Sequence, residues 1–229
     1  MDGAARNRHT RPFATALVTG GASGIGAATV TLLEGEGTEV LSLDLATGFD
    51  VADAAAWETV SPAEFAFLNA GVATGASGIA DLEEPAYRRA LAVNVDGVVF
   101  GVRRMAQVME PGSSIVATAS LAGLTPMPLD PVYTLTKHAV VGFVRAVAPQ
   151  LAERGIRINA VCPGFADTPI IEQELRDWVA GQGLSLIRPE RVAEAALLAA
   201  RSDETGQVWV VQPGREPLVY EFRGVPGPR

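Results

Sequence analysis

Thr19-Gly20-Gly21-Ala22-Ser23-Gly24-Ile25-Gly26 is the stretch that decides the fold. It follows an apolar run at Ala16-Leu17-Val18 and opens a helical pattern. Gly20 permits the tight turn, Gly24 lets the backbone approach a pyrophosphate, and Gly26 allows the helix to pack closely on the strand. Free N–H groups and the helix dipole then face anionic oxygens, which predicts a dinucleotide site instead of a merely structural turn. The predicted contacts are Gly20, Ser23, Gly24, Ile25 and Gly26.

Apolar runs alternate with helical patterns along the rest of the chain. Further strands are predicted at 40–43, 65–68, 114–117, 157–161 and 207–211. Short buried strands separated by helices imply a parallel sheet covered on both faces. We therefore predict an α/β fold, a single-domain Rossmann-like doubly wound parallel sheet with helices on both faces.

The length of 229 residues fits one such domain. We expect a flexible N-terminal arm at 1–13, the folded domain at 14–211 and a tail at 212–229 that is rich in Pro and Gly. Leu218, Tyr220 and Phe222 alternate in this tail. The alternation predicts an extended strand that docks on a neighbouring subunit or over the pocket.

Composition excludes several classes of protein. The net charge of -8 repels phosphate polymers, so nucleic acid is not an expected partner. Cys162 is the single cysteine and there are two histidines, which predicts no disulfide and no metal site. Apolar runs are too short for a membrane span and no signal-peptide pattern opens the chain, so we expect a cytoplasmic protein.

Asp44 is expected at the adenosine end of the predicted cofactor site. It ends the second strand about twenty residues beyond the glycine loop, where a carboxylate accepts hydrogen bonds from ribose hydroxyls and repels a 2′-phosphate. Leu45, a further predicted contact, and Ala46 supply no cation for such a phosphate. These features favour NAD over NADP, and the alternative is an ordinary solvated aspartate at a strand end.

Ser120, Tyr133 and Lys137 form the candidate catalytic group. Tyr133 and Lys137 are four residues apart, at the start of a helical pattern, and share one face of that helix. A phenol with a pKa of about 10 is a poor base at neutral pH, but an adjacent ammonium and a cationic nicotinamide favour phenolate. Tyr133 is thus predicted to exchange a proton with an alcohol or carbonyl oxygen, to which Ser120 hydrogen-bonds.

From about Ala14 to Val211 the chain resembles a classical short-chain dehydrogenase/reductase. The resemblance rests on the glycine loop, Ser120, the Tyr-x-x-x-Lys step, Asn94 in a helix, Asn-Ala-Gly at 69–71 after the family's fourth strand, and Pro163-Gly164 followed by Thr168. It implies an oxidoreductase that transfers hydride between a nicotinamide cofactor and an alcohol or ketone.

The resemblance also implies roles for single residues. Asn94 would hold a water in a proton relay behind Lys137, which would also bind the nicotinamide ribose with Tyr133; the alternative is a structural asparagine that kinks a helix. The further implied contacts are Asp50 and Val51 at the adenine, Asn69, Ala70 and Gly71 at the adenosine ribose, and Pro163, Gly164 and Thr168 at the nicotinamide.

Substrate choice is expected in two apolar segments with few cations, which favour a hydrophobic secondary alcohol or its ketone. Their residues are Leu121, Leu124, Met127 and Leu129, and Ile170, Ile171, Trp178, Leu184, Leu186 and Ile187. For each of them, simple packing of a lid helix is the alternative.

The chain also departs from the family pattern. Its segment between Asp50 and Asn69 is short, which leaves room for a brief helix at about 52–59 and a more open adenine edge. Family members commonly pair through the two long helices expected at about 90–108 and 132–154, so the resemblance implies a homotetramer or homodimer.

Other reactions and functions remain open at this point. Epimerases and dehydratases of this fold usually have a longer C-terminal region, and enoyl reductases space Tyr and Lys more widely. A non-catalytic NAD(H)-binding redox sensor would not need Ser120, Asn94, Tyr133 and Lys137 together.

Overall fold

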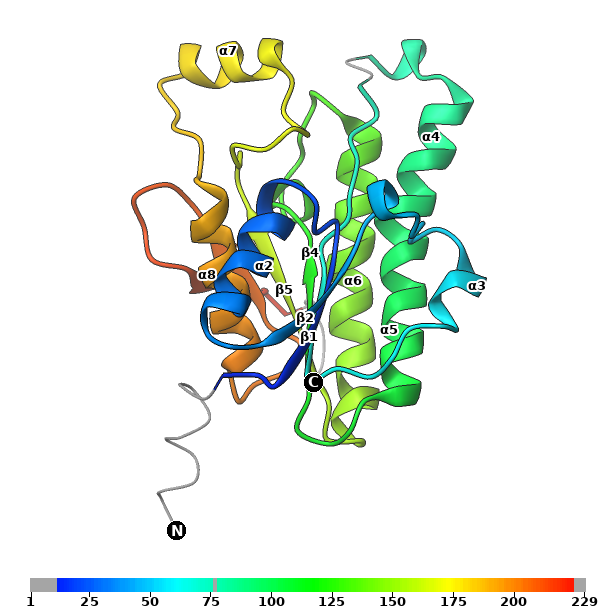
Figure 1. Cartoon of the computed structure of the whole chain (residues 1–229). Helices are drawn as coiled ribbons and strands as arrows, with labels where there is room; N and C mark the ends of the chain where they lie inside the picture. The colour runs from blue at the N-terminus through cyan, green and yellow to red at the C-terminus, as the bar shows by residue number, and fades with distance from the viewer. Residues whose placement is uncertain (1–11, 76–77, 225–229) are drawn as a thin grey trace.

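The computed structural model of the protein describes residues 12–75 and 78–224, and its centre is a seven-stranded sheet (Figure 1). The strands are β1 (Thr15–Thr19), β2 (Glu39–Leu43), β3 (Phe65–Leu68), β4 (Ser114–Thr118), β5 (Arg157–Pro163), β6 (Val208–Val211) and β7 (Leu218–Val219). Their order is β2-β1-β3-β4-β5-β6-β7, and all pairs are parallel except β6 with β7. The predicted fold class is therefore confirmed, and the carboxyl ends of β1 to β6 share one edge.

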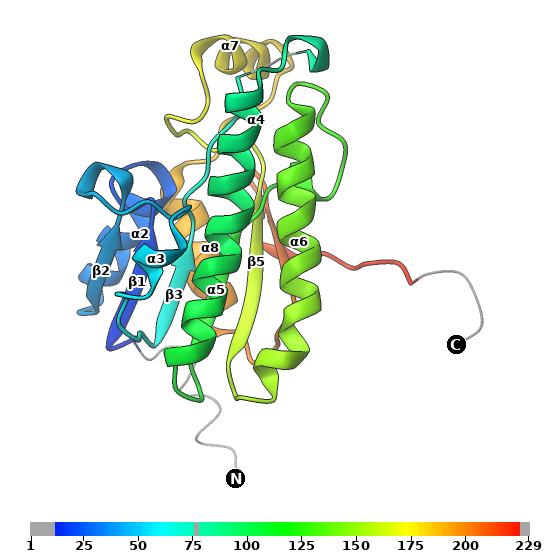
Figure 2. The same cartoon turned by 90° about the vertical axis from the view of Figure 1, so that its right-hand side faces the viewer.

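Helices cover both faces of the sheet (Figures 1 and 2). On one face lie α2 (Gly24–Gly35) and α8 (Pro189–Arg201), and on the other α4 (Glu84–Leu91), the π turn η3 (Ala92–Asp96), α5 (Gly97–Val108) and α6 (Pro131–Ala152). Ala16 and Val18 pack in the apolar core between the sheet and the helices α2 and α8. Leu17 packs in the core on the other face, under α5 and α6. This division explains why Ala16, Leu17 and Val18 are all apolar instead of alternating with polar residues.

The short segment between β2 and β3 holds no further strand. Asp50 and Val51 lie in a turn before α3 (Ala54–Trp57), and the next strand is β3, so Asn69 follows the third strand of this chain. In chain order the strand before Asn69 is therefore the third, whereas the resemblance counts it as the fourth. Trp57 Nε1 donates to Val51 O at 2.9 Å, which fixes the turn against the core. Without an outer neighbour, β2 is an edge strand.

Both ends of the described chain pack on the domain. The predicted arm lies, up to residue 11, outside the described residues, whereas the Phe13 ring stacks on Phe65 at 5.0 Å. In the tail, β7 pairs with β6, and Tyr220 N donates to Val208 O at 2.8 Å. The tail therefore does form an extended strand, but it pairs with its own sheet, and Figure 2 shows the following segment passing α6.

Candidate active site

Three side chains tie the carboxyl ends of the central strands together. Thr19 Oγ1, at the end of β1, accepts from Asn69 N at 2.9 Å and from Ala70 N at 3.1 Å. Thr118 Oγ1, at the end of β4, donates to Asn69 Oδ1 at 3.1 Å. Asn69 thus joins three strand ends and holds the floor of the site in one position.

The glycine loop makes closer contacts than the sequence predicts. A Cβ at Gly26 would overlap Gly20 O, so Gly26 is needed for contact with the loop's own turn and not only for contact of helix with strand. Gly24 has φ +52°, and a Cβ there would come within 2.9 Å of Thr168 Cγ2. The structure therefore brings Thr168 directly over the loop.

The first turn of α2 offers donors to an anion. Ser23 precedes the helix with extended φ and ψ but gives it no side-chain cap. The backbone N–H groups of the first turn need water or an anion as acceptors, and the helix dipole favours the anion.

Asp44 lies beside the same loop. Its Oδ2 accepts from Ala22 N at 3.0 Å and its Oδ1 from Ala46 N at 2.9 Å. Each carboxylate oxygen keeps a further lone pair that can accept from a ribose hydroxyl. Leu45 follows with 66% of its surface exposed, while Val51 is buried among core side chains and Asp50 Oδ1 accepts from Ala52 N.

Ser120, Tyr133 and Lys137 meet at the carboxyl ends of β4 and β5. Lys137 Nζ lies 5.4 Å from the centroid of the Tyr133 ring and donates to Thr118 O at 2.8 Å. Ser120 Oγ accepts from Ala122 N at 3.1 Å and lies 3.5 Å from Pro163 O. The helix places both α6 residues on one face, as their spacing predicts.

The pKa of Tyr133 moves in the direction opposite to our expectation. Although part of its surface is exposed, removal of the phenol from water raises its pKa to about 12, and the negative charge of Asp130 adds to this rise. Hydrogen bonding by Ser120 acts in the lowering direction. The reason is burial, which disfavours the phenolate more than the expected neighbours favour it.

Lys137 is only 2% exposed, and burial lowers its pKa to about 8. The buried Cys162 lies near enough to act on both groups, and burial raises its own pKa to about 12, so a small inert thiol is the better description of this residue. His138 is exposed and its Nδ1 lies 2.9 Å from Thr134 O, so its ring faces away from the site.

Asn94 is fully buried in the π turn η3, where its amide has protein partners. Its Oδ1 accepts from Val72 N at 2.8 Å, and its Nδ2 donates to Val72 O at 2.8 Å and to Thr136 Oγ1 at 3.0 Å. Thr136 Oγ1 in turn donates to Tyr133 O at 2.8 Å. These contacts fit the structural alternative, and the water relay stays a prediction.

The loop after β5 lies beside the catalytic group, and the resemblance assigns its Pro163, Gly164 and Thr168 to the nicotinamide. At Gly164 an added Cβ would lie 3.4 Å from Leu121 Cδ1 and 3.6 Å from Ile187 Cδ1, so the two apolar segments meet there. Of the second segment, Ile171 and Ile187 are core residues, whereas Trp178 and Leu184 on or after α7 (Gln173–Gly181) remain more than one third exposed.

Two residues of this region were missed in the sequence. Asp130 caps α6 and lies directly before Pro131, a helix-start signal that was available to sequence analysis. Arg176 on α7 donates to Thr168 O at 3.0 Å and to Ile171 O at 3.1 Å and pairs with Asp167. No local pattern reveals these contacts of Arg176, because they form only when α7 folds back on the loop.

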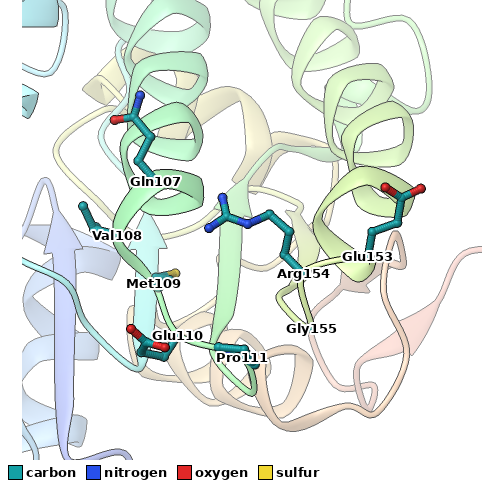
Figure 3. Close-up of a pocket in the computed structure, with 8 residues that line it drawn as sticks. All are labelled: Gln107, Val108, Met109, Glu110, Pro111, Glu153, Arg154 and Gly155. Atoms are coloured by element: carbon teal, nitrogen blue, oxygen red, sulfur yellow. The ribbon is translucent and has the colours of Figure 1, made fainter.

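A hollow at the opposite edge of the sheet carries no comparable chemistry (Figure 3). It lies where α5 and α6 end, at the amino ends of β4 and β5, and Arg154 points into it. Its lining residues are Gln107, Val108, Met109, Glu110, Pro111, Glu153, Arg154 and Gly155. Within residues 12–75 and 78–224, no group of three or more His, Cys, Asp or Glu side chains could hold a metal ion.

A family model described as enoyl-(acyl carrier protein) reductase matches residues 49–215. The chain is 35% identical to cis-4-hydroxycyclohexanecarboxylate dehydrogenase of Sinomonas cyclohexanicum, over 87% of this chain and 95% of that protein. It is 31% identical to cyclohexanol dehydrogenase of Acinetobacter sp. strain SE19, over 86% and 92%. It is 33% identical to the mitochondrial borneol dehydrogenase of Lavandula x intermedia, over 84% and 85%.

The chain belongs to the short-chain dehydrogenase/reductase family. This membership and the relatives' names support an oxidoreductase. As to membranes, no helix in the described part of this family member has both the length and the apolar character needed to cross one.

Proposed function

We propose that the protein is an NAD-dependent dehydrogenase that interconverts a hydrophobic cyclic secondary alcohol and its ketone. The observation that carries the proposal is the meeting of Ser120, Tyr133 and Lys137 at the strand ends beside the glycine loop. Carboxyl ends of parallel strands, next to a helix N-terminus, are where such folds bind ligands.

The residues present fit NAD. The uncapped N-terminus of α2 suits the pyrophosphate, and Asp44 offers carboxylate lone pairs to ribose hydroxyls. Thr168 is held over Gly24 on the side where the nicotinamide half would lie. The same carboxylate disfavours a 2′-phosphate by charge, which supports NAD over NADP.

Side chains of the protein would accept and donate the proton of the reaction. Bound NAD would supply the atom that accepts the hydride. Tyr133 would take the proton of the substrate hydroxyl, and Ser120 would hydrogen-bond the same oxygen and stabilise charge on it. Lys137, with a pKa of about 8, changes its protonation state near neutrality and could pass that proton on. In the reverse direction Tyr133 would donate the proton to the carbonyl oxygen.

The proposed substrate class rests on the apolar residues around the site and on the names of the relatives. Leu121 and Ile187 line the approach at Gly164, and three relatives carry the names of dehydrogenases for ring alcohols. The four-residue step between Tyr133 and Lys137 favours alcohol oxidation over the enoyl reduction in the family model's description.

The test is a panel of secondary alcohols incubated with NAD or NADP at alkaline pH, with formation of the reduced cofactor followed by absorbance. We expect turnover of cyclohexanol-type substrates with NAD, little with primary alcohols, and tighter binding of NADH than of NADPH. An Asp44→Ser variant should narrow that cofactor difference. Preference for NADPH would overturn the cofactor assignment, and NAD(H) binding without turnover of any alcohol would favour a redox sensor.

A further inference from the structure

Asp130 joins the two loops that border the catalytic tyrosine. Its Oδ1 accepts from Tyr133 N at 2.8 Å and thereby caps α6, and its Oδ2 accepts from Thr74 N at 2.8 Å. Thr74 lies in the segment that follows Asn69-Ala70-Gly71. One carboxylate therefore fixes both the first turn of α6 and the loop after β3.

Asp130 is also the anionic neighbour of a phenol that must ionise. The charged or titratable groups acting on Tyr133 in the described structure are Asp130, which precedes α6, Lys137 on α6, and Cys162 in β5. Ser120 adds a neutral hydroxyl. A negative charge beside the phenol disfavours the phenolate, so Asp130 acts against Lys137.

We propose that Asp130 is a positioning residue of the reaction: it holds Tyr133 and the Thr74 loop in register, and its charge sets the pH at which Tyr133 gives up its proton. The inference rests on the proposed function in so far as Tyr133 is the acid/base. It assigns to one side chain two structural bonds and an electrostatic effect, which the value of kcat and the position of the pH profile report separately.

Asp130→Asn keeps an oxygen that can cap α6, because asparagine is nearly as good an N-cap as aspartate. It removes the charge and also the bond from Thr74 N, since an amide nitrogen cannot accept. Asp130→Glu keeps the charge and moves the carboxylate by one methylene. Asp53→Asn is the matched control, since Asp53 caps the remote helix α3 by accepting from Ala55 N at 2.9 Å.

The first readout is the pH profile of kcat/KM for alcohol oxidation. With Asp130→Asn we expect the rising limb to move to lower pH by about 0.5 to 1 unit. With Asp130→Glu we expect the rising limb of the pH profile to stay at the same pH, and kcat to fall severalfold. An unmoved limb in the Asn variant, or an equal shift in Asp53→Asn, would overturn the electrostatic role, and full kcat in the Glu variant would overturn the positioning role.

The second readout needs neither substrate nor cofactor. Ultraviolet difference absorbance follows phenolate formation, and subtraction of a Tyr133→Phe variant isolates Tyr133 from the chain's two other tyrosines. Its ionisation should begin at lower pH in Asp130→Asn, with circular dichroism confirming the fold. Absence of turnover in the unaltered protein refutes the proposed function, whereas an unchanged titration of Tyr133 refutes the role of Asp130.

Discussion

Lys137 is the only lysine in a chain whose other basic side chains are arginines, and it is buried. An arginine could not serve in its place, because a guanidinium stays protonated whereas a buried lysine shifts its pKa readily. Burial lowers the Lys137 pKa to about 8 and raises that of Tyr133 to about 12. At neutral pH Tyr133 is therefore a neutral phenol, and Lys137 is an ammonium whose pKa lies close to that pH.

Tyr133→Phe should lower turnover by about 10²- to 10⁴-fold, the range typical for loss of general acid–base catalysis. The phenyl ring fills the same space, so binding of NADH should remain nearly unchanged, as a fluorescence titration would measure. Tyr220→Phe, on the tail, is the matched control and should keep full activity. Activity retained by Tyr133→Phe would contradict the assignment of the proton donor.

Lys137→Met should abolish activity yet stabilise the protein at pH 7. Lowering of its pKa from 10.5 to about 8 corresponds to roughly 3 kcal/mol of cost for the folded ammonium. Methionine removes this cost but leaves Thr118 O without its donor, at about 1 kcal/mol. The net gain in the free energy of unfolding, about 1 to 2 kcal/mol, would be measured by urea titration.

The pH dependence of this gain has a definite sign. Between pH 8 and 10.5 the folded protein has lost the Lys137 proton while the unfolded chain still holds it, so the unaltered protein becomes more stable as pH rises. The advantage of Lys137→Met should therefore shrink across that window. Nitrogen-15 labelling of lysine reports this residue alone and would give its midpoint directly; a midpoint near 10.5 would contradict the account.

At the scale of elements, α7 is joined to the cofactor side through Arg176. This side chain binds the carbonyls of Thr168 and Ile171 and pairs with Asp167, so one residue of the helix fixes the loop over Gly24. The helix itself stands at the edge of the molecule, above the strand ends (Figure 1). Its contribution to the position of the loop should exceed its contribution to overall stability.

Arg176→Ala should therefore weaken NADH binding by about tenfold, the effect of losing charge-assisted hydrogen bonds, with little change in Tm. Arg176→Lys restores the charge but not the forked donors and should recover only part of the affinity. The control is Arg88→Ala, which breaks an exposed pair with Glu84 on α4. Unchanged affinity in Arg176→Ala would show that the loop keeps its position without α7.

The sequence predicted elements well where chemistry and pattern are local. The strand before the glycine loop, the brief helix α3 and the long helix α6 lie within a few residues of their predicted ranges. The meeting of Ser120, Tyr133 and Lys137 was predictable because parallel strands end at one edge. The raised pKa of Tyr133 was not, since burial is a property of the packed structure, and neither were the long-range bonds of Arg176.

At the scale of the whole molecule, the described sheet ends in β2 on one side and in β7 on the other. The short segment after β2 places no strand beside it, while β7 extends the opposite side through antiparallel pairing with β6. The apolar alternation in the tail predicted the strand but could not show which chain it joins. Leu218, Tyr220 and Phe222 remain at least one third exposed there, and their contact with a second copy stays a prediction.

A truncation after Gly214 tests whether the tail contributes to stability, to assembly or to activity. The truncation removes β7, the contact of Arg145 with the Phe222 ring at 3.7 Å, and the exposed pair of Glu216 with Arg191. We expect Tm to fall by about 2 to 8 °C, the range for 1 to 2 kcal/mol in a domain of this size. The kcat/KM should stay unchanged, because no tail residue contacts Ser120, Tyr133 or Lys137 in the described structure.

Ending the chain after Gly224 is the control, since it leaves β7 and Phe222 in place. Light scattering on both truncations would separate the tail's two possible uses. If the longer truncation lowers the molar mass, the exposed side chains also bind a second copy, and if a folded truncation loses turnover, the tail reaches the pocket after all. Unchanged mass and turnover with a lower Tm would mean that β7 acts within its own sheet, where it covers the edge of β6.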